Sequence, residues 1–342
     1  MSVNLKELSS RLGLSPTTVS RALGGYSDVS ATTKERVLEM ARALGYQPNR
    51  AARQIAMGRA DAVGIVYSLD PDTLGNPAFL EVMAGLSHSL ERENIDLLLL
   101  AAQPESAAEM GTYERMVRGR RVDAAVVALT RVDDARIEYL LEAGLPFVAY
   151  GRSRKADRYP WFDFDNRAGG RLAVQQLVAL GHKRIVCVHA PLQLNFARQR
   201  HDGFIQGMRA AGLAVTPETS LAAGLDRRTG YAAGQRLLAL KPRPTAVVVQ
   251  NNLTGVGVIR ALIDAGVAVG PELSVLVYDG VPPDTLLRGL EVAAILQPTP
   301  YESGGTLGEM VLALIHGQPM AQRHVLRQPV FAAGDSIAPP RR

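Results

Sequence analysis

A short run near the N-terminus carries residue types that bind nucleic acids. Ser15-Pro16-Thr17-Thr18-Val19-Ser20-Arg21 brings four hydroxyl groups and one guanidinium together within two helical turns. Hydroxyls and backbone amides at a helix N-terminus suit phosphates and base edges, and an arginine can reach a guanine edge or a phosphate. The run therefore favours DNA binding. The alternative is a structural three-helix bundle with a solvated basic face.

Capping signals place that run on a helix within a bundle. Asn4 can cap a helix that extends to Leu12. Ser15-Pro16 supplies an N-cap and a first-turn proline for a second helix over 16–23, and a third is expected over 32–44. A helix, a glycine-containing turn and a second helix form the helix-turn-helix pattern.

The net charge is concentrated at the same end of the chain. The 342 residues include 38 Lys and Arg and 33 Asp and Glu, a net charge of +5. Residues 1–60 hold nine basic and four acidic residues, so they carry the whole excess, and the rest is neutral. This asymmetry indicates a small polyanion-binding head on a neutral body.

Composition excludes several classes of protein. A hydrophobic content of 47% with 21% charged residues is typical of a well-cored soluble protein. The start, Met1–Glu7, lacks an apolar signal segment, and no apolar run approaches the ~18 residues of a membrane span. The single cysteine, Cys187, lies in an apolar run and is expected to be a buried core thiol. We expect a cytoplasmic protein with no cofactor, no metal and no membrane partner.

Beyond a linker, the remaining residues predict a layered body. The segment 49–58 is too short to be a stable helix alone, so it is expected to fold only against a partner. After residue 61, apolar runs alternate with helical stretches, which indicates two doubly wound parallel-sheet subdomains. The runs are 63–68, 96–102, 124–129, 146–150, 185–189, 246–250, 273–278 and 292–296.

These patterns predict three segments. Residues 1–48 form a DNA-binding head, 49–60 a linker, and 61–342 a ligand-binding body. Crossings expected near 159–161 and 289–298 divide that body into an N-subdomain and a C-subdomain. The N-subdomain covers about 61–159 and 291–320, and the C-subdomain about 160–290 and 321–342.

Polar residues follow several predicted strands of the body. Arg198 and Arg200 come after the strand at 185–189, Asn251-Asn252 after that at 246–250, and Asp279 after that at 273–278. Ligands of open α/β sheets bind at such strand ends, and this polar set suits a neutral, hydroxyl-rich ligand such as a sugar. Surface salt bridges are the alternative for the arginines.

Other classes of protein fit less well. An enzyme on this fold would show a dinucleotide, Walker or nucleophile-elbow motif, and none occurs. The six histidines show no metal-ligand spacing. A solute-binding protein would share the body, but it needs an export signal and has no use for residues 1–58.

Four stretches of the head form a specific set of motifs: Asn4-Leu5-Lys6-Glu7-Leu8, Leu12–Leu23 with its Thr-Val-Ser-Arg core, Val29-Ser30, and Leu44–Arg53 with its Tyr-x-Pro-Asn pattern. Together they resemble the lac repressor family (LacI/GalR type) of bacterial transcription regulators, and the likeness continues through the body. The resemblance implies that the linker 49–60 is a hinge and that 61–342 is a periplasmic-binding-protein-like, effector-binding and dimerisation domain. It also implies a recognition helix at 16–23 and a hinge helix at 49–58 that widens the minor groove. In the hinge, Ile55 stands where the family usually has a leucine wedge. In the head, Gly24-Gly25-Tyr26 replaces the family's asparagine-containing turn. The implied DNA-binding residues are Asn4, Ser15, Pro16, Thr17, Thr18, Ser20, Arg21, Asn49, Ala52 and Ile55.

The resemblance also assigns an effector site. Asn195–Phe204 matches the segment whose arginine, here Arg200, grips the effector. Gly151-Arg152 resembles a pair found in sugar-responsive members and favours a glucoside, of the alpha-glucoside type. Arg227 stands at the lac repressor's cleft tryptophan, so its galactoside is not expected, and Trp161 is either a stacking surface or a packed crossover residue. The implied effector-binding residues are Asn76, Phe79, Arg152, Phe164, Arg200, Asn251, Asp279 and Gln297. For Asn76 and Phe79, an ordinary turn with a core phenylalanine is the alternative.

The implied function is repression of carbohydrate-utilisation genes. A homodimer would bind a pseudo-palindromic operator and release it when a mono- or disaccharide enters the cleft. The C-terminal residues 333–342 have no leucine heptad, which favours a dimer over a tetramer. The alternative is a co-repressor-dependent regulator of the same fold that responds to a non-sugar metabolite.

Overall fold

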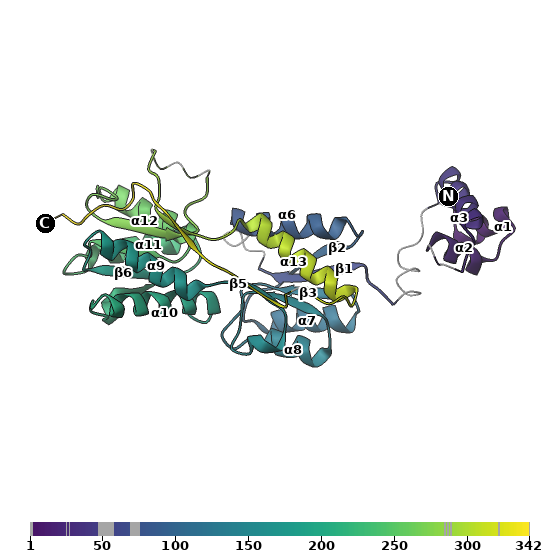
Figure 1. The fold of residues 1–342 in the computed structure, drawn as a ribbon, viewed down its shortest axis with the longest axis horizontal. Coiled ribbons are helices and arrows are strands. Elements are labelled where there is room, and N and C mark those ends of the chain that lie inside the picture. Colours follow the sequence, from purple (N-terminus) through teal and green to yellow (C-terminus); the bar gives the residue numbers. More distant parts are fainter. Residues whose placement is uncertain are drawn as a thin grey trace. The chain divides into compact units, whose positions relative to one another are not determined.

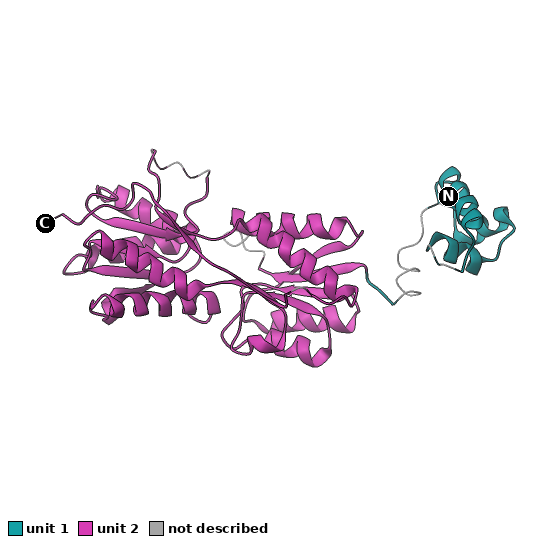
Figure 2. Cartoon of the chain, viewed as in Figure 1, with its two compact units in different colours: residues 1–60 teal, residues 61–342 magenta. Residues whose placement is uncertain are grey.

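The computed structural model describes residues 3–341 except 25, 27, 47–57, 69–75, 284, 286, 288 and 321. The chain forms two compact units, residues 1–60 and residues 61–342 (Figure 2). The predicted hinge residues Asn49, Ala52 and Ile55 lie outside the described residues, so their roles stay predictions.

The head is the predicted three-helix bundle. Its helices are α1 (Leu5–Leu12), α2 (Pro16–Leu23) and α3 (Ala31–Ala43). Asn4, Ser15 and Ser30 cap them, and each side chain accepts a hydrogen bond from a backbone N–H three residues ahead. The apolar stripes of the three helices close one small core, made of Leu8, Leu12, Val19, Ala22, Val29, Val37 and Ala41.

The first subdomain of the larger unit is built on a sheet whose described strands run in the order β11-β5-β4-β3-β1-β2, all parallel. Helices α6 and α13 cover one face, and α7 and α8 cover the other (Figure 1). The strands are β1 (Ala62–Tyr67), β2 (Asp96–Ala101), β3 (Ala124–Val127), β4 (Phe147–Tyr150), β5 (Trp161–Phe164) and β11 (His324–Arg327). The helices are α6 (Pro77–Glu91), α7 (Ala107–Arg118), α8 (Ala135–Ala143) and α13 (Pro300–Ile315), with a 3-10 turn at Ala156–Arg158.

The second subdomain repeats this plan, with the order β12-β10-β9-β8-β6-β7. All described pairs are parallel except β10 with β12. The strands are β6 (Ile185–His189), β7 (Ser220–Ala222), β8 (Ala246–Val249), β9 (Ser274–Tyr278), β10 (Ala294–Leu296) and β12 (Val330–Ala332). The helices are α9 (Asn166–Ala179), α10 (Asn195–Ala210), α11 (Arg227–Ala239) and α12 (Asn252–Asp264), with a 3-10 turn at Pro217–Thr219.

Both faces of the second sheet are buried, as the continuous apolar runs predicted. In β6, Val186 and Val188 pack with α11 and α12, whereas Ile185 and Cys187 pack with α9 and α10. The alternation follows from the two-residue period of a strand. The predicted burial of Cys187 is confirmed, and burial raises the pKa of its thiol. None of the described helices is both long and apolar enough to span a membrane.

Strand order tells where each subdomain would hold a ligand. Numbered along each half, both sheets follow the order 2-1-3-4-5, as β2-β1-β3-β4-β5 and as β7-β6-β8-β9-β10. Chain direction along the sheet reverses between β1 and β3 and between β6 and β8, and ligands of doubly wound folds bind beyond the carboxyl ends of the strands there. The predicted fold class is confirmed.

The chain passes between the two sheets later than expected. Trp161–Phe164 pairs with β4 and with β11, so the first crossing lies between β5 and α9 rather than at 159–161. The second lies between β10, which belongs to the second sheet, and α13, and it overlaps the expected range. The third, implied near 320 by the predicted bounds, lies later, between β11 and β12, because β11 still pairs with β5 of the first sheet. Short strands that pair with distant segments leave little local signal, which explains the difference.

Glycines allow the helices that carry the site to pack closely. A Cβ at Gly170 in α9 would overlap the carbonyl oxygen of Arg200 in α10, and one at Gly203 would overlap that of Arg167. The backbones of α9 and α10 therefore meet without intervening side chains. This contact sets the distance between α9 and α10.

Gly170→Ala is expected to lower the free energy of unfolding by about 1–3 kcal/mol, because the added methyl group overpacks this contact. Gly305→Ala is the matched control, since a Cβ there meets nothing within 4 Å. That control is expected to be neutral or slightly stabilising. Urea unfolding followed by far-UV circular dichroism measures both. Equal stability of the two variants would contradict the close contact.

Candidate functional site

The polar residues of the predicted recognition run lie on the solvent-exposed face of α2 and at its N-cap. Ser15, Pro16, Thr17, Ser20 and Arg21 are exposed and Thr18 is half-buried, whereas the apolar residues of the helix turn into the head's core. Residues 17, 20 and 21 share one face at helical spacing. This face presents hydroxyls and a guanidinium together.

Some of these polar groups form hydrogen bonds or ion pairs within the head. The Ser15 hydroxyl accepts the backbone N–H of Thr18 at 3.1 Å and lies 2.8 Å from its hydroxyl. The Asn4 side chain accepts the N–H of Glu7 at 2.9 Å. Arg21 forms an ion pair with Asp28 at 2.6 Å. Thr17 and Ser20 therefore keep the least committed side chains on this face.

Arg200 is the centre of the second site. Its side chain is 6% exposed. Nε donates to Asn166 Oδ1 at 2.9 Å, and Nη1 donates to the carbonyl oxygen of Gln250 at 2.7 Å. The guanidinium also lies over the rings of Tyr278, at 4.0 Å, and Phe196, at 5.0 Å. Its orientation is thus fixed by α9, α10, β8 and β9.

Asp279 faces the remaining nitrogen of that guanidinium. Its Oδ2 lies 3.6 Å from Arg200 Nη2, which is longer than a hydrogen bond. The residue follows β9 directly in the left-handed conformation, with φ of 62°, and its side chain is one-third exposed. Partial burial raises the pKa of Asp279, and the charge of Arg200 opposes that shift. A donor and an acceptor therefore stand side by side, each with hydrogen-bonding capacity left.

Arg152 connects the two subdomains. Its Nε donates to the buried carboxylate of Asp163 at 2.6 Å, and its Nη2 donates to the carbonyl oxygen of Phe164 at 3.2 Å. The same Nη2 donates across to Gln199 Oε1 of α10 at 3.0 Å. Burial raises the pKa of Asp163, and Arg152 opposes the shift. The guanidinium predicted to bind the effector is thus largely engaged by protein groups.

Further hydrogen bonds join the subdomains. The N–H of Asn195 donates to the carbonyl oxygen of Thr130 at 2.9 Å, and its side chain donates to that of Arg152 at 2.7 Å. Asn252 Nδ2 donates to Asn76 Oδ1 at 3.4 Å, a long bond. Asn76, predicted at the effector site, therefore lies at the boundary between the subdomains, where it also caps α6.

The remaining predicted effector residues have different surroundings. Asn251 caps α12, and its oxygen accepts the N–H of Thr254 at 3.1 Å. Phe79 is 8% exposed and stacks on Tyr67 at 3.7 Å, so it packs in the first core. Phe164 is buried. Gln297 Nε2 is buried and has no hydrogen-bond partner among the described residues.

Tyr150 was missed by sequence reasoning. It is the last residue of β4 in the first subdomain. Burial raises the pKa of its hydroxyl, and the charge of Asp279 in the second subdomain raises it further. The charge of Asp279 therefore acts on Tyr150 across the boundary between the subdomains. The signal was available, because Tyr150 is the polar-tipped last residue of a predicted strand, as Asp279 follows another.

The two open alternatives among the other candidates are resolved. Arg198 is exposed and donates to the carbonyl oxygen of Leu192 at 3.3 Å, so only Arg200 enters the site. Trp161 is 8% exposed and stacks on His324 at 4.8 Å, which makes it a packed residue at the start of β5 and not an exposed stacking surface. No group of His, Cys, Asp and Glu placed to hold a metal ion occurs in the described part of the chain.

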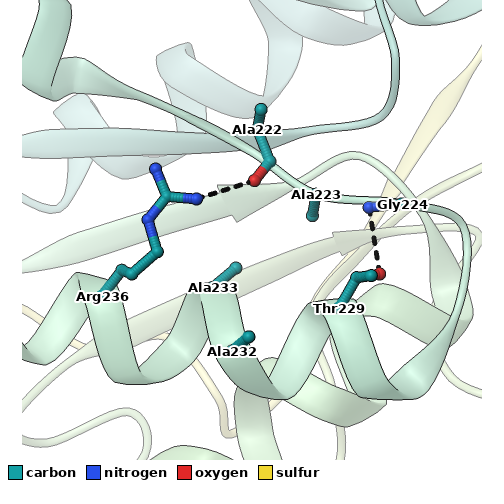
Figure 3. A pocket seen from close by; sticks show the side chains of 7 residues that line it. All are labelled: Ala222, Ala223, Gly224, Thr229, Ala232, Ala233 and Arg236. Carbon is teal, nitrogen blue, oxygen red and sulfur yellow. Dashed lines mark hydrogen bonds between the residues drawn. The ribbon is translucent and has the colours of Figure 1, made fainter.

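A separate concavity of about 340 Å³ lies beside β7 and α11 (Figure 3). Its polar groups bond one another. Arg236 Nη1 donates to the carbonyl oxygen of Ala222, and the N–H of Gly224 donates to the Thr229 hydroxyl, both at 3.0 Å. None of the predicted effector residues lines it. The concavity therefore plays no part in the site around Arg200.

A helix-turn-helix head joined to two doubly wound subdomains with polar residues at their strand ends defines a ligand-responsive DNA-binding regulator. Residues 4–49 match the bacterial regulatory proteins of the lacI family, and residues 60–332 match the periplasmic binding proteins and sugar binding domain of the LacI family. The chain belongs to the LacI family of transcription regulators and is not an enzyme.

Individual relatives agree with that membership. The chain is 39% identical to the HTH-type transcriptional regulator RafR of Escherichia coli over 339 residues, 99% of each chain. It is 37% identical to AglR of Rhizobium meliloti over 284 residues, 83% of this chain and 79% of that one. The structure of the transcriptional regulator CelR with cellobiose is similar with a TM-score of 0.73 at 26% identity, covering 98% and 99% of the two chains.

Gln199→Ala is expected to lower the free energy of unfolding by about 1–2 kcal/mol, because it removes a hydrogen bond to a charged group across the subdomains. The control is Gln206→Ala on the same helix. Gln206 is exposed and accepts from Arg171 at 3.1 Å within one subdomain. Its loss is expected to cost less than about 0.5 kcal/mol. Urea unfolding measures the free energy of unfolding of both variants. Equal decreases in the two would contradict a larger contribution from the Arg152–Gln199 bond.

Proposed function

We propose that this regulator represses carbohydrate-utilisation genes and is released from its operator by a mono- or disaccharide bound between the two subdomains. The observation that carries the proposal is the pair formed by Arg200 and Asp279. Arg200 Nη2 makes no hydrogen bond with the described residues, and the carboxylate 3.6 Å away cannot satisfy it. A ligand hydroxyl could accept from one and donate to the other.

The surroundings of that pair favour a neutral ligand. The charges of Arg200 and Asp279 cancel locally, so the pair attracts neither an anion nor a cation strongly. The rings of Phe196 and Tyr278 offer apolar faces beside it. The free amide of Gln297 offers one more donor. Saccharides combine apolar ring faces with many hydroxyls, and the regulator CelR was solved with cellobiose.

On the DNA side, α2 is proposed to lie in the major groove of the operator. Thr17, Ser20 and Arg21 would contact base edges, while Asn4, Ser15, Pro16 and Thr18 would contact phosphates near the helix start. The hinge residues Asn49, Ala52 and Ile55 are proposed to enter the minor groove, with Ile55 as the apolar wedge.

A homodimer would present two heads to a pseudo-palindromic operator. The edge strand β2 supports it, because Leu97–Leu100 lie there and Leu99 is 42% exposed. A leucine-rich edge strand is a pairing surface that a monomer would need to protect. We assign its outer edge to a second copy of the chain.

Arg200→Ala is expected to abolish the saccharide response while preserving DNA binding. A thermal-shift screen identifies the sugar first, and maltose and cellobiose serve as an alpha- and beta-linked pair of otherwise identical composition. The variant should bind the selected sugar roughly 100-fold more weakly, since two or more charge-assisted contacts depend on this guanidinium. Exposed Arg198 on the same helix provides the control, Arg198→Ala. Loss of both activities in R200A would show a purely structural arginine.

Sugar and DNA are expected to weaken each other's binding by the same factor. Switching an equilibrium from mostly bound to mostly free requires a ~10⁴-fold preference of the sugar for one state. Calorimetric titration of the sugar, with and without a duplex selected by this protein from a randomised pool, measures the factor. Identical sugar affinities in the two titrations would rule out release by linkage.

A further inference from the structure

We propose that Tyr26 and Asp28, in the turn after α2, position the guanidinium of Arg21 for base recognition and thereby set the operator specificity. The inference rests on the proposed role of α2 as the recognition helix. It adds two residues that do not belong to that helix.

Asp28 fixes the plane of the Arg21 guanidinium. Arg21 Nε donates to Asp28 Oδ1 at 3.2 Å, and Nη2 lies 2.6 Å from Oδ2, a two-point contact. The side chains are 45% and 53% exposed, and exposed pairs add little to folding stability. Two parallel contacts nevertheless define an orientation, which one contact would not. The pair therefore acts on where Arg21 points.

Tyr26 covers one face of the same guanidinium. The guanidinium carbon lies 4.9 Å from the ring centroid, within the range of a cation–π contact. Tyr26 is 41% exposed, so it is not packed into the core of the head. Arg21 is thus held at its edge by a carboxylate and at its face by a ring.

Gly24 makes room for that ring. Its backbone, with φ of −80°, suits any residue, so its conformation does not require glycine. A Cβ there would lie 2.8 Å from Cε2 of Tyr26 and would push the ring away. The absence of a side chain at Gly24 therefore serves Tyr26.

The turn is tied to the helix that it serves. The N–H of Tyr26 donates to the carbonyl oxygen of Arg21 at 3.1 Å. The N–H of Val29 donates to that of Tyr26 at 3.3 Å, and Val29 is part of the head's core. Tyr26 and Asp28 consequently have fixed positions relative to Arg21.

Holding Arg21 in one orientation favours discrimination over affinity. A free arginine pairs with any nearby phosphate, whereas an oriented one presents its two donors only where a guanine offers O6 and N7. Asp28 also repels phosphates, so it weakens binding to every DNA sequence. Its removal should strengthen non-specific binding and weaken discrimination.

Asp28→Asn is the direct test, with Glu7→Gln as its control. Glu7 forms an exposed ion pair with Arg11 at 3.0 Å on α1, so its replacement removes the same charge from the same head. The full chain is titrated with a duplex that the wild type selected from a randomised pool and with a shuffled duplex of equal composition. Both variants should bind the shuffled duplex a few-fold more tightly. Only D28N should lower the selected-to-shuffled affinity ratio, by about 5- to 10-fold relative to wild type, whereas E7Q should leave the ratio unchanged.

The ring is tested in the same assay. Tyr26→Leu should lower the ratio relative to wild type, because it removes the face that covers the guanidinium. Tyr26→Phe keeps that face and should leave the ratio unchanged. Far-UV circular dichroism checks that each variant keeps its helices.

Arg21→Ala separates this inference from the recognition-helix assignment. If Asp28 acts through Arg21, adding D28N to R21A should not lower the ratio further. Equal ratios for D28N and E7Q, with a lowered ratio in R21A, would overturn the positioning role and leave the recognition helix intact. An unchanged ratio in R21A would overturn the recognition-helix assignment itself.

Discussion

The buried positive charge of Arg200 is the constraint that organises the ligand site. A charge removed from water needs close compensation, and here Asn166, Gln250 and Asp279 supply it from three different elements. Those elements can converge only because parallel strands end at one edge of the sheet and because glycines let α9 and α10 pack closely. The site is therefore a consequence of the sheet's topology as much as of the residues in it.

The parts of the fold that depend on neighbouring residues could be predicted from the sequence. Asn4, Ser15 and Ser30 cap their helices through bonds three residues long, so the head followed from local chemistry. The eight long apolar runs are all strands. The four missed strands, β5, β7, β11 and β12, pair with distant segments or lie at an edge. Their formation is decided by the sheet they join, which no short window of sequence records.

The same limit applies to side chains. Arg200 and Asp279 could be placed together, because both follow strands of one sheet. The partners of Arg152 could not be foreseen, since Asp163 and Gln199 reach it from two subdomains. A sequence pattern indicates the backbone position of a polar residue. How many hydrogen bonds its side chain can still make depends on the groups that surround it in the folded protein. Arg200 keeps such capacity, and Arg152 keeps little.

That difference bears on how a ligand could switch the protein. A shift from mostly one state to mostly the other requires about 5.5 kcal/mol of differential binding. Single hydrogen bonds to charged groups contribute about 1.5–3 kcal/mol. The Arg152–Gln199 bond is of that size, and the neutral bond from Asn195 to the carbonyl oxygen of Arg152 contributes less, about 0.5–1.5 kcal/mol, so replacing any one of them is insufficient. If the proposed saccharide binds at Arg200 and Asp279, it must also alter several of these cross-subdomain bonds to switch the protein. In that proposal Arg152 contributes through its bond to Gln199.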